Sequence, residues 1–274
     1  MADTSKQSQS IDRRKKKYRS DGTPIWGKRY IEGPGVWVSC VKGKESQTIA
    51  EIYELFESVA SELWPIGEPK PGESAVEDSE SELSIEAQVA KEVSAMKRPR
   101  PEPRFVNCQT NTPCVVFISC KPPVDPVELI YKHIINVEKT GITRTRYTHR
   151  LVPVSDSCVA NLPEIQTLCN SIFSSYFSHH PDKTFKYKIE LRMRNHTTIP
   201  RPTIINHIAS CVPDSHTVAL ADPELFILVE VFKSICGISI VENYYKLQKF
   251  NVMEIANSRN SLESQDERRI IARD

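Results

Sequence analysis

The chain has 274 residues, enough for two modest domains that each bury a core, and its 36 Lys and Arg against 35 Asp and Glu give a net charge of +1. Attraction to a polyanion must therefore come from local clusters of cations and not from the total charge. No stretch approaches the ~18 to 20 apolar residues of a membrane span, and the N-terminus lacks the apolar core of a signal peptide, so we expect an intracellular protein without membrane contact.

The N-terminal segment is strongly basic. Residues 1–30 carry nine Lys or Arg against three Asp. Residues 1–25 have too little apolar content to fold, and we expect a disordered basic arm. Such a run either adds phosphate contacts or acts as a nuclear import signal. We expect the protein in the nucleus, in the nucleolus above all, with the cytoplasm as the alternative. The cations of the arm are Arg13, Arg14, Lys15, Lys16, Lys17 and Arg19.

A first domain is predicted over residues 26–141. A strand is predicted at 35–43, and apolar residues at three-and-four spacing predict a helix at 46–64, which Pro65 ends. Residues 67–103 are rich in Glu, Ser, Pro and Lys and nearly free of aromatic residues. This composition predicts an acidic, disordered insertion.

The first domain resumes after the insertion. Residues 104–109 and 114–120 predict two short strands joined by a turn. A helix is predicted at 125–141, with Asp125 as its N-cap and Gly141 just beyond its end. The order β-α-(insertion)-β-β-α contains most of a ferredoxin-like half-sandwich. We therefore expect an α/β (α+β) protein that begins with a ferredoxin-like domain.

A second domain is predicted over residues 142–256. A basic run leads into a strand at 143–154, and a helix follows at 161–177. In FKYKIELRMRNH, residues 185–196, apolar and charged residues alternate, which predicts a strand with one face on a core and the other facing water. The charged face carries four cations and one anion. A short helix is predicted at 201–212.

The end of the second domain supplies the rest of a sheet. Within residues 215–243, the run 226–232 is nearly all apolar and predicts an interior strand covered on both faces. Asp222 and Glu224 flank a proline, so we place them in a tight turn and not in a pair of catalytic carboxylates. Residues 257–274 are polar with balanced charge, and we expect a disordered tail.

Sequence signatures of enzymes and metal sites do not occur. The chain has no phosphate-binding loop, no H-E-x-x-H and no G-x-S-x-G. Its eight cysteines form no C-x-x-C pair and no zinc spacing, which favours reduced core thiols. We therefore expect no catalytic residue, no metal and no bound cofactor.

Basic and polar residues gather in three groups of the second half. If their elements pack as one layer, the groups form one continuous positive surface of the kind that phosphate contacts need. Tyr147, Asn195 and Asn206 would add stacking and hydrogen bonds to unpaired bases, although a capping role for Asn206 is equally favoured. The candidate RNA-binding residues are Arg144, Arg146, Tyr147, His149, Arg150, Lys186, Lys188, Arg192, Arg194, Asn195, His196, Arg201 and Asn206.

Three blocks of the chain resemble a known family. RYTHRLVPV, FKYKIELRMRNH and VALADPELFILVEVFKSICGISIV look like successive blocks of a THUMP domain, the RNA-binding module of thiouridine synthetases, RNA methylases and pseudouridine synthases. The resemblance is close over 145–243 and loose over 30–140. The sequence departs from the family pattern at residues 219–224, which read ALADPE where the family turn often reads D-L-x-N-P-D. The resemblance implies a THUMP α/β domain with a mixed sheet after a ferredoxin-like domain.

Because we see no catalytic domain attached, the chain is most similar to stand-alone THUMP proteins, which act as tRNA-binding adaptors for N4-acetylcytidine formation in the D arm of serine and leucine tRNAs. This resemblance implies a non-catalytic protein that holds the acceptor end of tRNA for a separate RNA cytidine acetyltransferase, which would use acetyl-CoA and ATP. Changing Lys188, Arg192 and Arg194 to Glu is then expected to abolish tRNA retention without unfolding the protein. Two alternatives remain: a self-contained RNA-modifying enzyme, and a protein-only scaffold.

Overall fold

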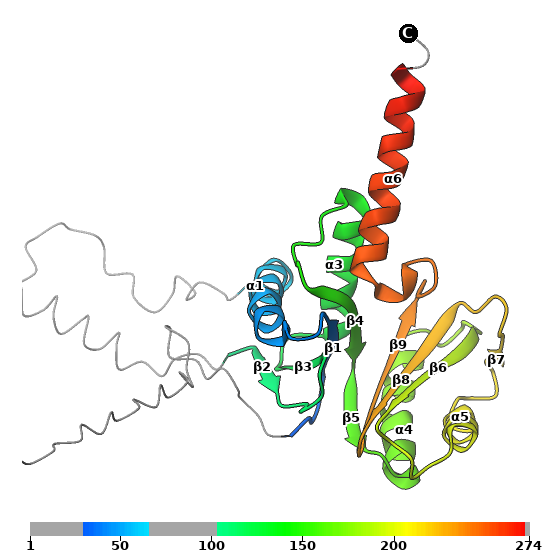
Figure 1. Cartoon of the computed structure of the whole chain (residues 1–274). Helices are drawn as coiled ribbons and strands as arrows, with labels where there is room; N and C mark the ends of the chain where they lie inside the picture. The colour runs from blue at the N-terminus through cyan, green and yellow to red at the C-terminus, as the bar shows by residue number, and fades with distance from the viewer. Residues whose placement is uncertain (1–29, 66–102, 272–274) are drawn as a thin grey trace, which may run out of the picture.

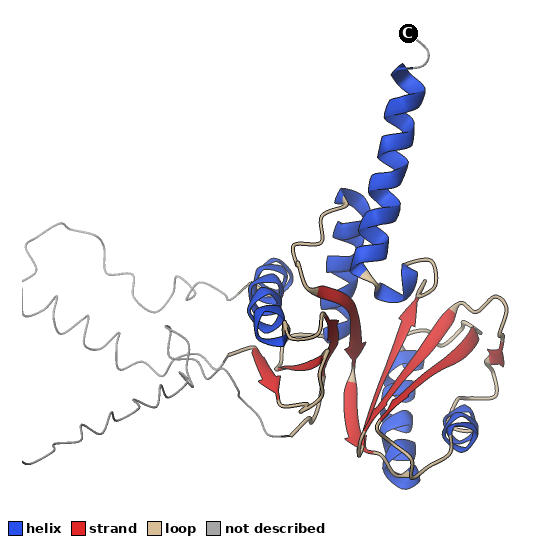
Figure 2. Ribbon diagram, viewed as in Figure 1, coloured by secondary structure: helices blue, strands red, loops and turns tan. Residues whose placement is uncertain are grey.

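The computed structural model describes residues 30–65 and 103–271 (Figure 1). The basic arm and nearly all of the acidic insertion expected from the sequence lie outside these residues, so both stay predictions. The described chain forms two sheets with helices packed on them (Figure 2). The expected mixed α/β class is therefore confirmed.

The first unit is an antiparallel sheet with two helices. Its elements are β1 (Gly35–Cys40), α1 (Glu45–Leu63), β2 (Phe105–Cys108), β3 (Val115–Cys120), α3 (Pro126–Thr140) and β4 (Thr148–Val154). The strands run in the order β2-β3-β1-β4, and every neighbouring pair is antiparallel. This arrangement is consistent with the ferredoxin-like domain that we expected. The predicted N-cap is also confirmed, because Asp125 accepts hydrogen bonds from the backbone N–H groups of Val127 and Glu128.

The strand β4 belongs to this first sheet, which corrects the domain boundary that we expected at residue 141. Leu151 pairs with Val38 and Val152 with Trp37 across β1. The basic run ahead of β4 marks a strand in the sequence, but the partner of that strand lies more than a hundred residues earlier. Local patterns carry no information on such a pairing, and we assigned the strand to the wrong sheet.

The second unit is a mixed sheet with two helices on one face. Its elements are β5 (Asp156–Val159), α4 (Leu162–Ser178), β6 (Lys186–Arg194), α5 (Arg201–Ala209), β7 (Thr217–Val218), β8 (Leu225–Phe232) and β9 (Ile235–Glu242). The strand order is β5-β9-β8-β6-β7, with β6 parallel to β7 and β8. All eight residues of β8 are buried, which confirms the predicted interior strand.

The two sheets pack face to face through β8. Alternate residues such as Ile227 and Val229 lie in a core with α4 and α5, whereas Phe226 and Phe232 lie in the core of the first unit. The rings of Trp37 and Phe232 have centroids 4.9 Å apart. The outer face of the second sheet is therefore covered by the first unit over much of its area. This contact determines how far the charged side chains on that face are shielded from water.

The C-terminal helix corrects another expectation. A short 3-10 turn, η1 (Gln248–Phe250), leads into α6 (Val252–Ile271), where we expected a disordered tail from residue 257. The first turns of α6 are held in the first core by Val252 and Ile255, and residues 257–271 contain no proline or glycine that would end the helix. The helix therefore continues and projects from the body (Figure 1). None of the helices within the described residues is both long and apolar enough to span a bilayer.

A buried histidine in α3 makes a stability prediction possible. His133 is 2% exposed, and its Nε2 has no hydrogen-bond partner among the described residues. Burial, with a smaller contribution from the charge of Arg144, lowers the pKa of His133 to about 4 from its ordinary 6.5. The unfolded chain therefore binds a proton between these pH values that the folded chain does not, and stability is lost as the pH falls through this window.

We expect acidification from pH 6.5 to pH 4 to cost about 3 kcal/mol of unfolding free energy through this one residue. His133→Leu removes the imidazole and should flatten the pH dependence by that amount. Urea unfolding at a series of pH values measures the difference. His149→Leu, which changes an exposed imidazole on β4, is the matched control. An unchanged pH slope in His133→Leu would show that His133 titrates normally.

Candidate nucleic-acid interface

The strand β6 has the two faces that its alternation predicts. Tyr187 and Leu191 are buried in the core beneath α4 and α5. The opposite face carries Lys188, Glu190, Arg192 and Arg194, all of them half-buried. This face does not simply meet water, as we expected, because the first unit packs beside it. Lys188, Arg192 and Arg194 are therefore partly desolvated, which strengthens their electrostatic interactions, whereas Lys186 at the start of β6 is exposed.

Three arginines surround one buried carboxylate at the junction of the two units. The parallel register places Arg192 beside Glu230 of β8, with Nη1 of Arg192 3.3 Å from Oε1 of Glu230. Glu230 is 6% exposed. Burial raises the pKa of the Glu230 carboxyl, and the charges of Arg192, Arg194 and Arg150 act against that rise. We call Arg150, Arg192 and Arg194 the arginine cluster. Together with Glu230 it has a net charge of +2.

The protein does not supply enough negative charge and hydrogen-bond acceptors to balance the arginine cluster. Burial lowers the pKa of the Arg194 guanidinium; the charge of Glu230 opposes this shift, and the charges of Arg192 and Arg150 add to it. In addition, Nε of Arg150 is buried without a hydrogen-bond acceptor in the described part of the chain. Guanidinium groups form their strongest hydrogen bonds with carboxylates and phosphates. An excess of partly buried guanidinium donors is therefore suited to binding an anion.

A small pocket opens beside the cluster. It has a volume of about 200 Å³ and is lined by Glu190, Arg192, Arg201, Glu230 and Tyr244 among others. Arg201 is exposed at the first turn of α5, where the helix dipole adds partial positive charge. The structure thus brings Arg201 to the same rim as Arg192, as the sequence predicted. The pocket is open to a ligand from solvent, and Arg192 of the half-buried arginine cluster lines it.

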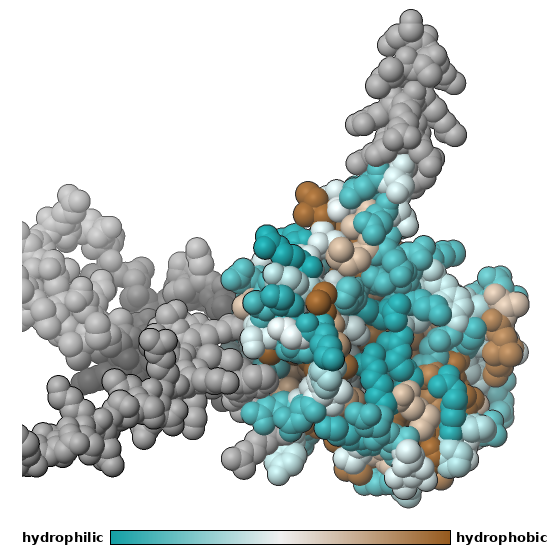
Figure 3. All heavy atoms as spheres, in the orientation of Figure 1, coloured by the Kyte–Doolittle hydropathy of each residue, from teal (hydrophilic) through white to brown (hydrophobic). Residues whose placement is uncertain are grey.

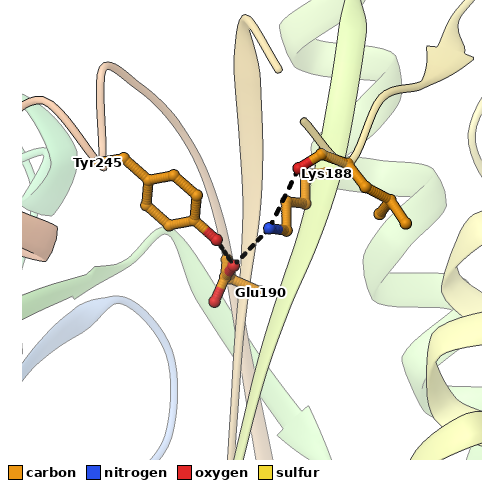
Figure 4. A network of polar contacts seen from close by, with 4 residues as sticks. Lys188, Glu190 and Tyr245 are labelled. Carbon is orange, nitrogen blue, oxygen red and sulfur yellow. Dashed lines mark hydrogen bonds and ion pairs between the residues drawn. The ribbon is translucent and has the colours of Figure 1, made fainter. Parts of the chain in front are cut away.

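Lys188 differs from the free cation that we expected. Its Nζ lies 3.5 Å from Oε1 of Glu190 and 4.8 Å from the ring centroid of Tyr245. The Tyr245 hydroxyl donates a hydrogen bond to the same carboxylate (Figure 4). The side chains of β6 and of the loop after β9 therefore form a closed polar network. Lys188 adds little net charge to the face, because Glu190 compensates it.

The basic lead-in to β4 lies elsewhere, which corrects the single positive surface that we expected. Nη2 of Arg144 donates to Oγ of Ser58 on α1. The backbone N–H groups of Arg146 and Tyr147 donate to Glu51, also on α1. These residues follow the first sheet because β4 pairs there. Of the lead-in group, Arg150 joins the cluster, while His149 is exposed on β4.

The residues that follow β6 shape its loop. Asn195 has a positive φ of 54°, a conformation that asparagine tolerates better than most residues. Nδ1 of His196 donates to the carbonyl of Lys233 at 2.6 Å, and its Nε2 accepts from the N–H of Ile199 at 3.2 Å. His196 therefore holds the loop before α5 in place. Lys186 and Asn206 are exposed at the start of β6 and on α5.

Comparison with known proteins places the chain in a family. An uncharacterized protein of Schizosaccharomyces pombe is 33% identical over 221 residues, which cover 81% of this chain and 75% of that protein. The tRNA acetyltransferase TAN1 of Saccharomyces cerevisiae is 31% identical over 249 residues, 82% of this chain and 85% of that protein. The THUMP domain family matches residues 159–241. The chain belongs to the THUMP-domain family. The resemblance seen in the sequence is thereby confirmed.

Solved structures give a weaker likeness. The THUMP domain of THUMP domain-containing protein 1 superposes with a TM-score of 0.26 at 21% identity, over 30% of this chain and 84% of that one. The protein PH1313 of Pyrococcus horikoshii gives a TM-score of 0.44 at 11% identity, over 76% of this chain and 55% of that one.

The THUMP match covers only part of the candidate interface. Residues 159–241 include β6, α5 and Glu230. Arg150, Tyr244 and Tyr245 lie outside this range, and Arg150 comes from the first unit. The candidate interface is thus built by the THUMP domain and its neighbour together. Figure 3 shows that hydrophilic residues cover most of the face in view, with small apolar patches between them.

Sequence reasoning missed several of these residues. Glu230 carries the only charge in the run 226–232, and that charge was the available signal of a buried ionic contact. Tyr244 and Tyr245 directly follow the last strand of the THUMP match, and we assigned them no role. By contrast, Asp222 lies between two strands as predicted, because residues 219–224 connect β7 to β8, and Oε2 of Glu224 accepts from the N–H of Lys186. The connection is a loop of six residues and not a tight turn.

Other parts of the surface suit nucleic acid less well. A pocket of about 600 Å³ lies between α3 and α4 and is lined by Asp125, Glu128 and Asp156. Because no Lys or Arg among the described residues lines this pocket, its carboxylates would repel phosphate groups. Across the described ranges, no three His, Cys, Asp or Glu side chains come together in a group that could hold a metal ion. The arginine cluster and its pocket are therefore the candidate site for an anionic ligand.

Proposed function

We propose that this chain binds tRNA and presents it to a separate RNA cytidine acetyltransferase for N4-acetylcytidine formation. The arginine cluster is the observation that carries this proposal. The charges of three arginines act on one carboxylate, and Nε of Arg150 is buried without a hydrogen-bond partner within the described residues. A phosphate of the tRNA would supply the missing negative charge and the missing acceptor. The relative named tRNA acetyltransferase TAN1 supports tRNA as the nucleic acid.

Both units contribute to the proposed site. Arg192, Arg194 and Arg201 come from the THUMP domain, and Arg150 comes from β4 of the first sheet. Binding of a phosphate at this junction would fix the RNA relative to both units. The first unit would then set the distance between the bound acceptor end and the modified cytidine. Serine and leucine tRNAs, with the cytidine in the D arm, are the substrates that we propose from the family resemblance.

The chemistry is proposed to reside in the partner. Acetyl-CoA and ATP would bind to the acetyltransferase, and this chain would contribute binding energy and position. The nucleus, and the nucleolus in particular, is the proposed location. The basic arm around Arg13 to Arg19 would add phosphate contacts or direct nuclear import. The printed name of the Saccharomyces cerevisiae relative favours one second candidate, an acetyltransferase in its own right.

The test of this proposal separates binding from catalysis. The purified full chain should retain tRNA on filters, and log Kobs should fall linearly with log salt by roughly 0.7 to 0.9 per neutralised phosphate. With labelled acetyl-CoA and ATP, the chain alone should leave the tRNA unlabelled, and addition of the RNA cytidine acetyltransferase should label it. Labelling by the chain alone would establish the second candidate. Retention that does not depend on salt would contradict the phosphate contacts.

A further inference from the structure

Four of the eight cysteines gather in the core of the THUMP domain. They come from four different segments: Cys158 in β5, Cys169 in α4, Cys211 after α5 and Cys236 in β9. Their core lies on the α4 and α5 side of the sheet, whereas the arginine cluster lies on the other side. The proposed function therefore does not use these thiols. All four are free in the structure.

Two of these thiols face each other across neighbouring strands. The antiparallel register of β5 and β9 pairs Cys158 directly with Cys236. Directly opposed residues of antiparallel strands have Cα atoms about 4.5 to 5.5 Å apart, which lies within the range of about 4.4 to 6.8 Å for disulfides. The two side chains also point to the same face of the sheet. A disulfide between them thus needs no rearrangement of the strands.

The two thiols differ in access to solvent. The strand β5 is the edge of its sheet, and Cys158 on it is half-buried. Cys236 on β9 is fully buried. A small oxidant from solvent therefore reaches Cys158 first. Cys236 can react only with a group that is already at Cys158 or inside the core.

The hydrogen bond between the two thiols also makes Cys158 more reactive than Cys236. The Cys236 thiol donates to the sulfur of Cys158, which lowers the pKa of Cys158, although burial and the charges of Glu164 and Asp156 oppose this shift. The same hydrogen bond, together with burial, raises the pKa of Cys236. Because the thiolate is the nucleophile, Cys158 is the more reactive of the pair.

We propose that Cys158 is a site of oxidation by hydroperoxides and that Cys236 resolves it to a reversible disulfide across β5 and β9. In the first step the Cys158 thiolate attacks one oxygen of ROOH. The S–O bond forms, the O–O bond breaks, and the leaving alkoxide takes up a proton to become ROH. Cys158 is then a sulfenic acid.

In the second step the Cys236 sulfur attacks the Cys158 sulfur. The S–S bond forms, the S–O bond breaks, and the leaving hydroxide takes the proton of the Cys236 thiol and becomes water. The two thiols supply two electrons, and the hydroperoxide accepts them. An added dithiol returns both cysteines to thiols by exchange.

A neighbouring cysteine provides an internal control. Cys211 is half-buried like Cys158, but it follows α5 and lies on no strand. Cys114 is not a suitable control, because the β1–β3 register continues to place it opposite Cys40, whose backbone N–H donates to the Cys114 carbonyl at 3.0 Å. Burial raises the pKa of Cys211 and, more strongly, that of Cys169, with which it shares a hydrogen bond. Greater exposure therefore does not explain a difference in rate between Cys158 and Cys211. A thiol partner directly opposite on the next strand does.

The test treats the full chain with a small excess of hydrogen peroxide and follows each cysteine by alkylation and peptide mapping. We expect Cys158 to be lost at least about tenfold faster than Cys211, and the intact mass to fall by about 2 Da as one disulfide forms. The linked peptides should contain Cys158 and Cys236, and dithiothreitol should restore both thiols. Equal rates for Cys158 and Cys211, or a link from Cys158 to Cys169, would overturn the proposal.

Two variants separate the two roles. In Cys236→Ser, the sulfenic acid of Cys158 should persist and react with dimedone. In Cys158→Ser, Cys236 should stay reduced under the same treatment. Mapping of the unchanged chain decides the question if either variant fails to fold. Because the readout is thiol chemistry and not tRNA binding, the result is independent of the proposed function.

Discussion

The double variant Arg192→Glu/Arg194→Glu should have a free energy of unfolding about 3 to 5 kcal/mol lower than that of the wild type, because the change leaves the buried carboxylate of Glu230 without its partners. Glu230 is 6% exposed, and Arg192 lies 3.3 Å from it. In the double variant, two new carboxylates would stand beside Glu230 in a partly desolvated site. Urea unfolding of the wild type and the variant at pH 7 measures the loss.

A further change identifies the cause of that loss. Glu230→Gln in the Arg192→Glu/Arg194→Glu background removes the buried charge and should recover most of the lost stability. Lys186→Glu is the matched control, because Lys186 is exposed at the start of the same strand and should change stability by less than about 1 kcal/mol. If the double variant unfolds like the wild type, the arginines do not compensate Glu230.

This expectation changes how tRNA binding can be tested. From the sequence, reversing Lys188, Arg192 and Arg194 was expected to remove binding and spare the fold. In the structure Lys188 pairs with Glu190 and Arg192 with Glu230. Loss of binding by that variant would therefore report loss of structure as well as loss of contacts. A binding test needs exposed cations at the rim of the site, where no buried acid depends on them.

Local sequence patterns predicted the elements of this fold well, because they depend on neighbouring residues. The alternation in FKYKIELRMRNH gave β6, and the end signals around Asp125 and Gly141 gave α3. The position of β4 could not be predicted in the same way, because its partner β1 is far away in the chain. The tail that proved to be α6 was misjudged because its anchor in the first core is a tertiary contact.

The candidate site shows the same division. The sequence placed Arg192, Arg194 and Arg201 near one another, since they lie on consecutive elements of one domain. It also grouped Arg144 and Arg146 with them, whereas β4 carries those two residues to α1 and only Arg150 to the cluster. The apolar run 226–232 predicted a covered strand around Glu230, but the arginines that surround this carboxylate come from two sheets, whose packing no local pattern encodes. The net charge of the site could therefore be assessed only in the structure.

Reversing two exposed cations of the THUMP domain, one at the rim of the pocket and one at the start of β6, should weaken tRNA binding by about tenfold or more at about 0.1 M salt, because each lost phosphate contact removes a counterion-release contribution. Arg201→Glu/Lys186→Glu is the variant of choice, since both side chains are exposed. The salt slope of log Kobs should fall by roughly 1 to 2 units. Filter binding of tRNA over a salt series measures both quantities, and the thermal transition should stay within a few degrees of the wild type.

Arg144→Glu/Arg146→Glu is the decisive comparison, because it makes the same change in total charge on the face of α1. If binding follows the arginine cluster, this variant should keep nearly wild-type affinity and slope. If binding follows total charge, both double variants should weaken it equally, since long-range attraction does not distinguish the two faces. A greater loss of tRNA affinity in Arg144→Glu/Arg146→Glu would show that the contact surface lies beside α1. It would contradict the site at the junction of the two sheets.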